Sequence, residues 1–146
     1  MKEKIRIIIA DDHDMIRQTW KLLLQQDLQF EVIAECKSGE ELLKLLPLIF
    51  PDIILLDINM NPVNGFEATK KIMKQWPDAR IIGMSINDQP VYARNLLQLG
   101  ARGYVTKDSS REEVSKAILS VMNGEKYVCE EIRKKMVPSL SPGEND

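Results

Sequence analysis

The chain has 146 residues, with 20 basic and 22 acidic side chains, a net charge of −2 and 44% hydrophobic residues. A chain of this length can bury its own core, and this composition is typical of a globular domain, which excludes a disordered or fibrous protein. The near-balance of charge excludes a domain that holds nucleic acid by itself. Cys36 and Cys129 lack the spacing of a zinc site, so we expect two reduced thiols.

Neither the N-terminus nor the most apolar segment of the sequence indicates a membrane protein. The N-terminal residues carry no apolar stretch of the kind found in secretory signals. The most apolar region, 42–58, is interrupted by charged residues and by Pro47 and Pro51, so it cannot span a bilayer. We therefore expect a cytoplasmic protein without membrane contact.

Five short apolar runs predict strands, and segments with helical spacing separate them. The first and third runs are almost continuously apolar, which is typical of parallel strands covered on both faces. The predicted strands, in chain order, are 5–9, 31–34, 53–56, 80–84 and 103–105.

Each predicted strand is followed by an apolar stripe of helical period. The first helix carries Trp20 on its stripe, with Asp14 as the expected N-cap. Capping boxes at Ser38–Glu41 and Ser110–Glu113 start the second and fifth helices, and Pro77 ends the third. A fourth stripe covers 93–100. The alternation predicts an α/β fold of (βα)₅ type, an open parallel sheet with helices on both faces.

Polar side chains lie where these strands end. Asp11 and Asp12 follow the first strand, and Asp57 ends the third. Ser85 follows the fourth strand, and Lys107 closes the fifth. Because ligands of open α/β sheets bind beyond the carboxyl ends of the strands, we expect these side chains to form one site.

This set of side chains suits phosphoryl chemistry. Three neighbouring carboxylates repel one another unless a cation lies among them, and Mg²⁺ prefers few carboxylates together with water and phosphoryl oxygens. Lys107 supplies a positive charge and Ser85 a hydroxyl donor for a phosphoryl group, while an aspartate can itself be the nucleophile. We interpret the set as a Mg²⁺-assisted phosphoryl acceptor. His13, the single histidine, we interpret as a structural or solvated neighbour of the acidic pair.

These residues resemble the receiver domain of bacterial two-component response regulators over about residues 4–124. The motifs Ala10–His13, Asn64–Glu67 and Gly100–Lys107 are similar to the NarL/FixJ-like (LuxR-type) subgroup. The resemblance implies a doubly wound, flavodoxin-like sheet of order 2-1-3-4-5. It also implies a regulatory domain rather than an enzyme, one that assists only its own phosphorylation and dephosphorylation.

The resemblance assigns roles to the site residues. Asp57 would accept phosphate from a sensor histidine kinase. Mg²⁺ (or Mn²⁺) would be bound by Asp12, Asp57 and the backbone carbonyl of Asn59, with Asp11 acting mainly through a metal-bound water.

Further roles concern the response to phosphate. Ser85 and Lys107 would contact the phosphoryl oxygens, and Ser85 with Tyr104 would form a switch pair in which the ring turns inward. Asn59 and Asn87 occupy positions that tune dephosphorylation rate in the family.

Three positions depart from the family pattern. The proline after the acceptor is displaced by one residue in Met60–Pro62, for which we expect a modified turn. Asp14 stands where the family often has proline, and no proline follows Lys107.

The expected organisation is a receiver domain over 1–124 and a short helix (130–137) with an interdomain linker (138–143) inside 125–146. We expect the N-terminal part of a transcriptional regulator that binds DNA through a C-terminal helix-turn-helix domain absent from this chain, with a possible homodimer on phosphorylation. The alternatives are a stand-alone receiver and a Mg²⁺-dependent haloacid-dehalogenase-like phosphatase. That phosphatase needs a general acid two residues after the nucleophile, where this chain has Asn59.

Overall fold

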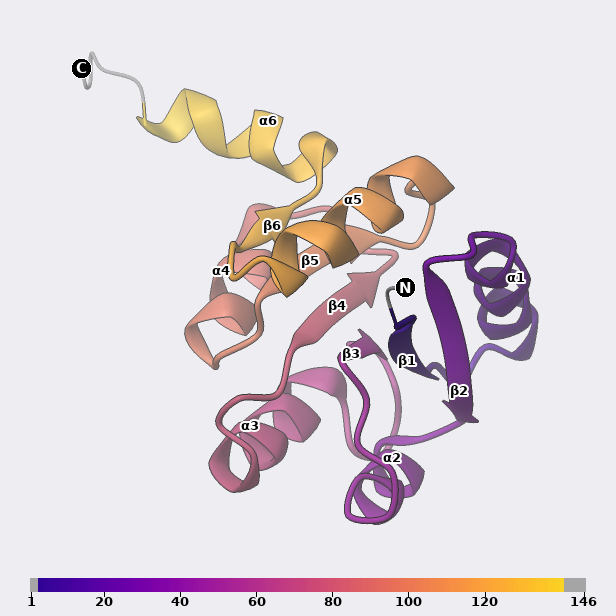
Figure 1. Cartoon of the computed structure of the whole chain (residues 1–146). Coiled ribbons are helices and arrows are strands. Elements are labelled where there is room, and N and C mark those ends of the chain that lie inside the picture. Colours follow the sequence, from indigo (N-terminus) through magenta and orange to yellow (C-terminus); the bar gives the residue numbers. More distant parts are fainter. Residues whose placement is uncertain (1–2, 141–146) are drawn as a thin grey trace.

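Strands and helices alternate along the chain and form one parallel sheet between two helical layers (Figure 1). The computed structural model describes residues 3–140, with side chains for residues 3–136. The strands are β1 (Ile5–Ala10), β2 (Phe30–Cys36), β3 (Ile53–Asp57), β4 (Ile81–Ser85), β5 (Gly103–Thr106) and β6 (Tyr127–Val128). The helices are α1 (Asp14–Gln25), α2 (Gly39–Leu45), α3 (Gly65–Gln75), α4 (Pro90–Gln98), α5 (Arg111–Met122) and α6 (Glu130–Leu140).

The sheet order is β2-β1-β3-β4-β5-β6, with every pairing parallel. The predicted fold class and the order of the first five strands are confirmed. The sixth strand is an addition to the prediction: Tyr127 and Val128 pair with Gly103 and Tyr104 of β5. A strand of two residues is too short to carry a hydrophobic period, so the sequence pattern contains no signal for it.

The apolar runs of the sequence become the buried centre of the sheet. All five residues of β3 and all five of β4 are buried, because helices cover both faces. Helices α1 and α5 lie on one face, and α2, α3 and α4 lie on the other (Figure 1). Within the described residues, no helix has the length and hydropathy needed to cross a bilayer.

Two of the three predicted N-caps are confirmed and one is wrong. Ser38 accepts a hydrogen bond from the backbone N–H of Glu41, and Ser110 accepts one from Glu113. The expected N-cap role of Asp14 is wrong: Asp14 is the first residue of α1 and His13 occupies the N-cap position. The physical reason is that the Asp14 carboxylate accepts a hydrogen bond from the Arg17 guanidinium at 2.8 Å.

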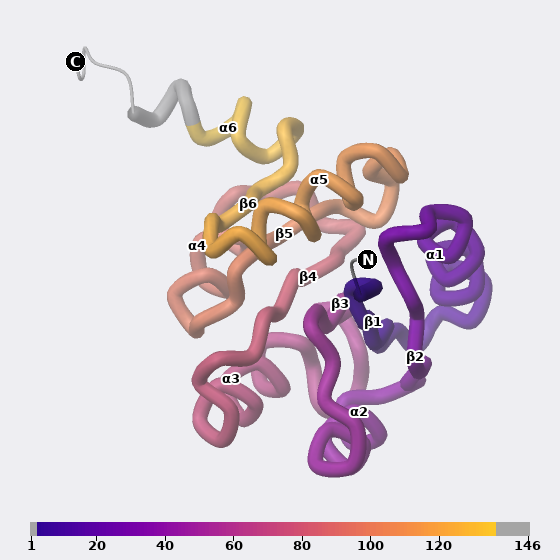
Figure 2. Tube along the Cα trace, in the orientation of Figure 1, coloured from indigo at the N-terminus to yellow at the C-terminus, as the bar shows by residue number. Residues whose placement is uncertain are grey.

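The C-terminal segment returns to the sheet and then leaves it along the edge beyond β5 (Figure 2). The predicted helix is longer than expected, since α6 includes the first three residues of the expected linker. The rest of that linker lies outside the described residues. Cys129 and Ile132 are fully buried, and α6 contacts α4, so this segment packs against the domain.

The loop after Asp57 closes tightly on the end of β3. Its modified turn contains a cis peptide bond between Asn61 and Pro62, and the N–H of Gly65 donates to the carbonyl of Ile58 at 3.1 Å. A Cβ atom at position 65 would lie 2.4 Å from the Ile58 Cα atom, which is closer than real Cβ contacts allow. Glycine at this position therefore lets α3 begin directly beside the acceptor residue.

We predict that Gly65→Ala destabilises the domain, because its Cβ would collide with backbone that cannot move like a flexible side chain. The free energy of unfolding, measured by urea denaturation, should fall by about 1–3 kcal/mol. Lys70→Ala, at an exposed position of the same helix, is the control and should change it by less than about 0.5 kcal/mol. Equal stability of the two variants would contradict the close approach.

Candidate functional site

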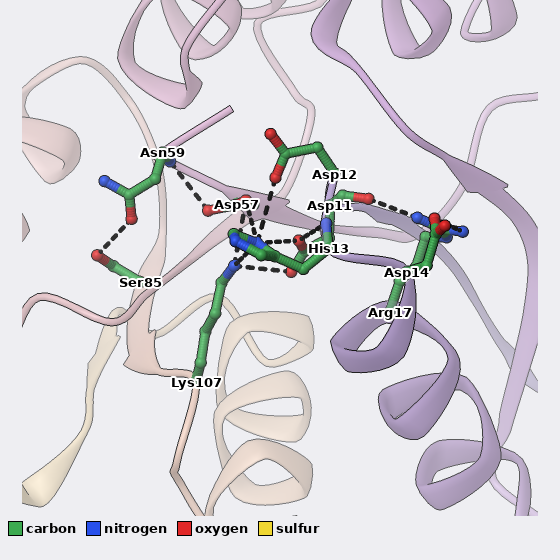
Figure 3. Close-up of polar contacts among 9 residues, drawn as sticks. All are labelled: Asp11, Asp12, His13, Asp14, Arg17, Asp57, Asn59, Ser85 and Lys107. Carbon is green, nitrogen blue, oxygen red and sulfur yellow. Dashed lines mark hydrogen bonds and ion pairs between the residues drawn. The ribbon is translucent and has the colours of Figure 1, made fainter. Parts of the chain in front are cut away.

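The predicted site residues gather at the carboxyl edge of the sheet (Figure 3). Asp11 and Asp12 follow β1, Asp57 is the last residue of β3 and Ser85 the last of β4. Lys107 follows β5 and reaches back across the edge. The parallel topology brings these ends together from positions up to 96 residues apart, as the sequence predicts.

An ammonium group joins two of the carboxylates at the centre of the site. Lys107 Nζ lies 3.0 Å from Asp11 Oδ2 and 3.1 Å from Asp57 Oδ2. The three side chains are 5%, 4% and 0% exposed, respectively. Away from water, the ammonium offsets the repulsion between the two carboxylates.

A short turn after β5 fixes the backbone of Lys107. Its N–H donates to the carbonyl of Ser85 at 2.8 Å. The N–H of Ser109 donates to the carbonyl of Thr106 at 3.0 Å, and their hydroxyl oxygens lie 3.1 Å apart. These bonds hold the turn without a proline after Lys107.

The two oxygens of Asp57 have different surroundings. Oδ1 accepts a hydrogen bond from the N–H of Asn59 at 2.9 Å, whereas the buried Oδ2 is ion-paired with the Lys107 ammonium at 3.1 Å and accepts no backbone hydrogen bond. Burial raises the pKa of Asp57 to about 6; the Asp11 charge adds to this, while the Asn59 N–H and Lys107 oppose it. One oxygen is thus held by the backbone and the other by the ion pair with Lys107.

Asp12 and His13 form the rim of the site. Asp12 is 34% exposed and His13 is 53% exposed. The His13 Nδ1 atom turns inward, 3.2 Å from an oxygen of each of Asp11 and Asp12 and 3.8 Å from Asp57 Oδ2 (Figure 3). The sequence placed His13 next to the acidic pair but gave no sign of the direction of its ring.

The donor set fits a divalent cation. One ligand atom from each of Asp11, Asp12, His13 and Asp57 lies within 4.8 Å of the others. The Asp57 carboxylate most directly favours a cation, because it is buried and shares the single Lys107 ammonium with Asp11. Oxygen donors of this kind suit Mg²⁺ or Mn²⁺.

Ser85 and Tyr104, the expected switch pair, are linked through Asn87. The Ser85 hydroxyl donates to Asn59 Oδ1 at 3.0 Å and accepts from the N–H of Asn87 at 2.8 Å. The Tyr104 hydroxyl donates to the carbonyl of Asn87 at 3.1 Å. The Tyr104 ring is fully buried in this structure, and burial raises its pKa to about 12.

Arg17 supports the site, a role that the sequence pattern does not predict. Its guanidinium donates to the carbonyl of Asp11 at 2.7 Å, and also to Asp14 and Glu35. The side chain is 5% exposed. By tying the end of β1 to α1 and β2, Arg17 positions the backbone that carries the acidic pair. Its only signal in the sequence is an arginine three residues after Asp14.

Comparisons with known proteins show the family to which the fold is similar. Residues 7–119 match the family described as response regulator receiver domain. The transcriptional regulatory protein DegU of Brevibacillus brevis is 35% identical over 136 residues, or 93% of this chain and 58% of that protein. The response regulator GacA of Pseudomonas aeruginosa is 31% identical over 143 residues, or 97% of this chain and 67% of that protein. This chain thus spans about three fifths to two thirds of these relatives.

A solved structure shows the same arrangement of elements. The crystal structure of a LuxR-family two-component response regulator from Aurantimonas is 28% identical, with a TM-score of 0.89. The likeness covers 94% of this chain and 98% of that one.

We predict that the buried Asp57 carboxylate makes stability depend on pH. The pKa of Asp57 is about 6 in the folded protein and 3.8 in its ordinary state, so the folded state binds the proton more tightly. The free energy of unfolding should therefore fall as pH rises from about 4 to about 6. Without divalent cations, Asp57→Asn should therefore gain stability over the wild type as pH rises, by about 2–3 kcal/mol at pH 7.

Urea denaturation in EDTA at several pH values measures this difference. The exposed Asp78→Asn makes the same chemical change without burial, and its difference from the wild type should stay near zero. If the difference in free energy of unfolding between Asp57→Asn and the wild type did not change with pH, ionisation of Asp57 would not affect stability, and the prediction would be wrong.

Proposed function

Because this chain belongs to the family of response regulator receiver domains, we propose that Asp57 accepts a phosphoryl group from a sensor histidine kinase and that the β4–β5 surface changes in response. The observation that carries the proposal is the buried Asp57 carboxylate, which has one oxygen without a hydrogen-bond partner and an ammonium 3.1 Å away. Such a group is a nucleophile placed beside the charge that its product needs.

In the proposed transfer, a carboxylate oxygen of Asp57 attacks the phosphorus of phosphohistidine. An O–P bond forms, the P–N bond breaks, and the leaving imidazole nitrogen keeps the electron pair. At neutral pH a carboxyl group with a pKa of about 6 is mostly ionised and can attack. Lys107 and Ser85 would then contact the phosphoryl oxygens, and a bound Mg²⁺ or Mn²⁺ would neutralise part of their charge.

The binding residues follow from the cluster. Asp12 and Asp57 would hold the cation directly, and Asp11 would act through a bound water. The carbonyl of Asn59 is proposed as a further ligand.

The response begins at Ser85. A phosphoryl group adds roughly −1.5 to −2 charges, which attracts a hydroxyl that now donates to Asn59. If the hydroxyl turns, Asn87 N–H loses its acceptor, and the loop that Asn87 shares with Asp88 must readjust. Because the Tyr104 ring is already buried, we place the main movement in this loop, with the Tyr104 hydroxyl following the Asn87 carbonyl.

The same loop contacts the C-terminal helix. Lys135 of α6 donates to the Asp88 carboxylate, and the N–H of Cys129 donates to the carbonyl of Tyr104 at 3.0 Å. A change at Ser85 can thus reach α6 through directly bonded residues. We propose that residues 1–124 are the receiver and that 125–146 connect it to a DNA-binding output domain, as in a transcriptional regulator, with homodimerisation on phosphorylation.

Asn59 and Asn87 are proposed to set the lifetime of the phosphoryl group. Asn59 lies two residues after the acceptor, and its amide oxygen accepts a hydrogen bond from the Ser85 hydroxyl. The same residue argues against a phosphatase, because an amide cannot serve as the general acid that such an enzyme needs. We therefore propose a regulatory phosphoacceptor and not a turnover enzyme.

We predict that acetyl phosphate with Mg²⁺ labels the wild type and leaves Asp57→Asn unlabelled, because the amide is no nucleophile. Intact-mass spectrometry should show a gain of about 80 Da, the mass of one phosphoryl group, in the wild type only. Asp78→Asn, which changes an exposed aspartate, should be labelled like the wild type. Equal labelling of Asp57→Asn would remove the acceptor assignment, and steady release of phosphate from a small ester would favour the phosphatase.

We predict that the phosphoryl mimic beryllofluoride with Mg²⁺ shifts backbone amide NMR signals of residues 85–107 and also of α6. Lys135→Ala should weaken the shifts in α6 and keep those near Ser85, because it removes the bond to Asp88 and leaves the Cys129–Tyr104 bond in place. Lys134→Ala, at the neighbouring position paired with Glu130, should keep both. Shifts confined to the immediate neighbours of Asp57 would contradict the proposed response.

A further inference from the structure

Helix α6 is fixed to the domain at its start, so the fold sets the position of Lys135. Cys129 and Ile132 are fully buried, and β6 pairs with β5 directly before this helix. The Glu113 carboxylate of α5 accepts a hydrogen bond from the N–H of Glu130, the first residue of α6, at 2.7 Å. Lys135 therefore approaches the loop between β4 and α4 from a helix that is held in place.

The loop between β4 and α4 is a compact turn in which Asn87 is bonded on three sides. Its N–H donates to the Ser85 hydroxyl at 2.8 Å, and its carbonyl accepts from the Tyr104 hydroxyl at 3.1 Å. Its side-chain oxygen accepts from the N–H of Gln89 at 3.2 Å. Because these bonds stiffen the turn, a force on Asp88, in its middle, is transmitted to the Asn87 N–H.

The contact between α6 and this turn is an ion pair. Lys135 donates to the Asp88 carboxylate, and this bond lowers the pKa of Asp88, so both groups are charged at neutral pH. The pair therefore stabilises the arrangement in which the Asn87 N–H donates to the Ser85 hydroxyl and that hydroxyl donates to Asn59.

A phosphoryl group needs the opposite arrangement, because it attracts the Ser85 hydroxyl away from these partners. We propose that α6 restrains phosphorylation of its own domain: the Lys135–Asp88 contact favours the arrangement without phosphate and lowers the affinity of the site for a phosphoryl group. Coupling between two sites is reciprocal, so phosphorylation loosens this contact of α6 by the same factor. This inference rests on the proposed function and adds the sign of the coupling, which a path of hydrogen bonds does not determine.

The test is the affinity of the full chain for beryllofluoride with saturating Mg²⁺, followed by the amide NMR signals of residues 85–89. Lys135→Ala should bind about two- to fivefold more tightly than the wild type, the range for loss of one partly exposed ion pair. The sign is decisive, because removal of a positive charge weakens anion binding when only long-range attraction acts. Lys134→Ala removes the same charge at the neighbouring position, which pairs with Glu130, and should bind no more tightly than the wild type.

A double-mutant cycle separates the contact from general effects of charge. In an Asp88→Ala background, Lys135→Ala should cause no further gain, because its partner is already absent. Binding by Lys135→Ala that equals or falls below that of the wild type, or an undiminished gain in the Asp88→Ala background, would overturn this inference and leave phosphorylation of Asp57 intact. If no variant bound beryllofluoride and acetyl phosphate labelled none, the proposed function would fail and this inference with it.

Discussion

The contact of the Lys107 ammonium with Asp11 and Asp57 is the interaction on which the site depends. Parallel strand topology brings carboxylates together at one edge of the sheet, where they would repel one another. A single buried ammonium offsets that repulsion and pairs with the Asp57 oxygen that accepts no backbone hydrogen bond. The acceptor is consequently held in place, partly neutralised and still able to form a bond.

The surrounding structure serves to hold this contact. Arg17 ties the end of β1, and the turn after β5 ties Lys107 to Ser85. Gly65 lets α3 begin against the backbone of Ile58, directly after the acceptor strand. These elements come from separate parts of the chain, so the site exists only in the folded domain. On the side of β4 and β5, hydrogen bonds continue from Ser85 to the loop that contacts α6.

The sequence predicted the fold and the members of the site better than their orientation. Apolar runs and capping boxes report local conformation, and residues at strand ends follow from topology, so Asp57, Ser85 and Lys107 could be placed together in advance. The inward His13 ring could not, because charges on strands distant in sequence decide its direction. The Lys135–Asp88 contact could not be predicted from the sequence either, because it joins two exposed side chains 47 positions apart that no local pattern relates.

We propose that phosphorylation converts the Asp57 carboxylate to a mixed anhydride. Borohydride reduces an acyl phosphate to an alcohol and leaves a free carboxylate intact, so it converts a phosphorylated aspartate to homoserine. Peptide mapping by mass spectrometry after phosphorylation and reduction locates the modified residue. The account predicts homoserine at position 57 alone. Homoserine at Asp11 or Asp12, or an unmodified residue 57 in a phosphorylated chain, would contradict it.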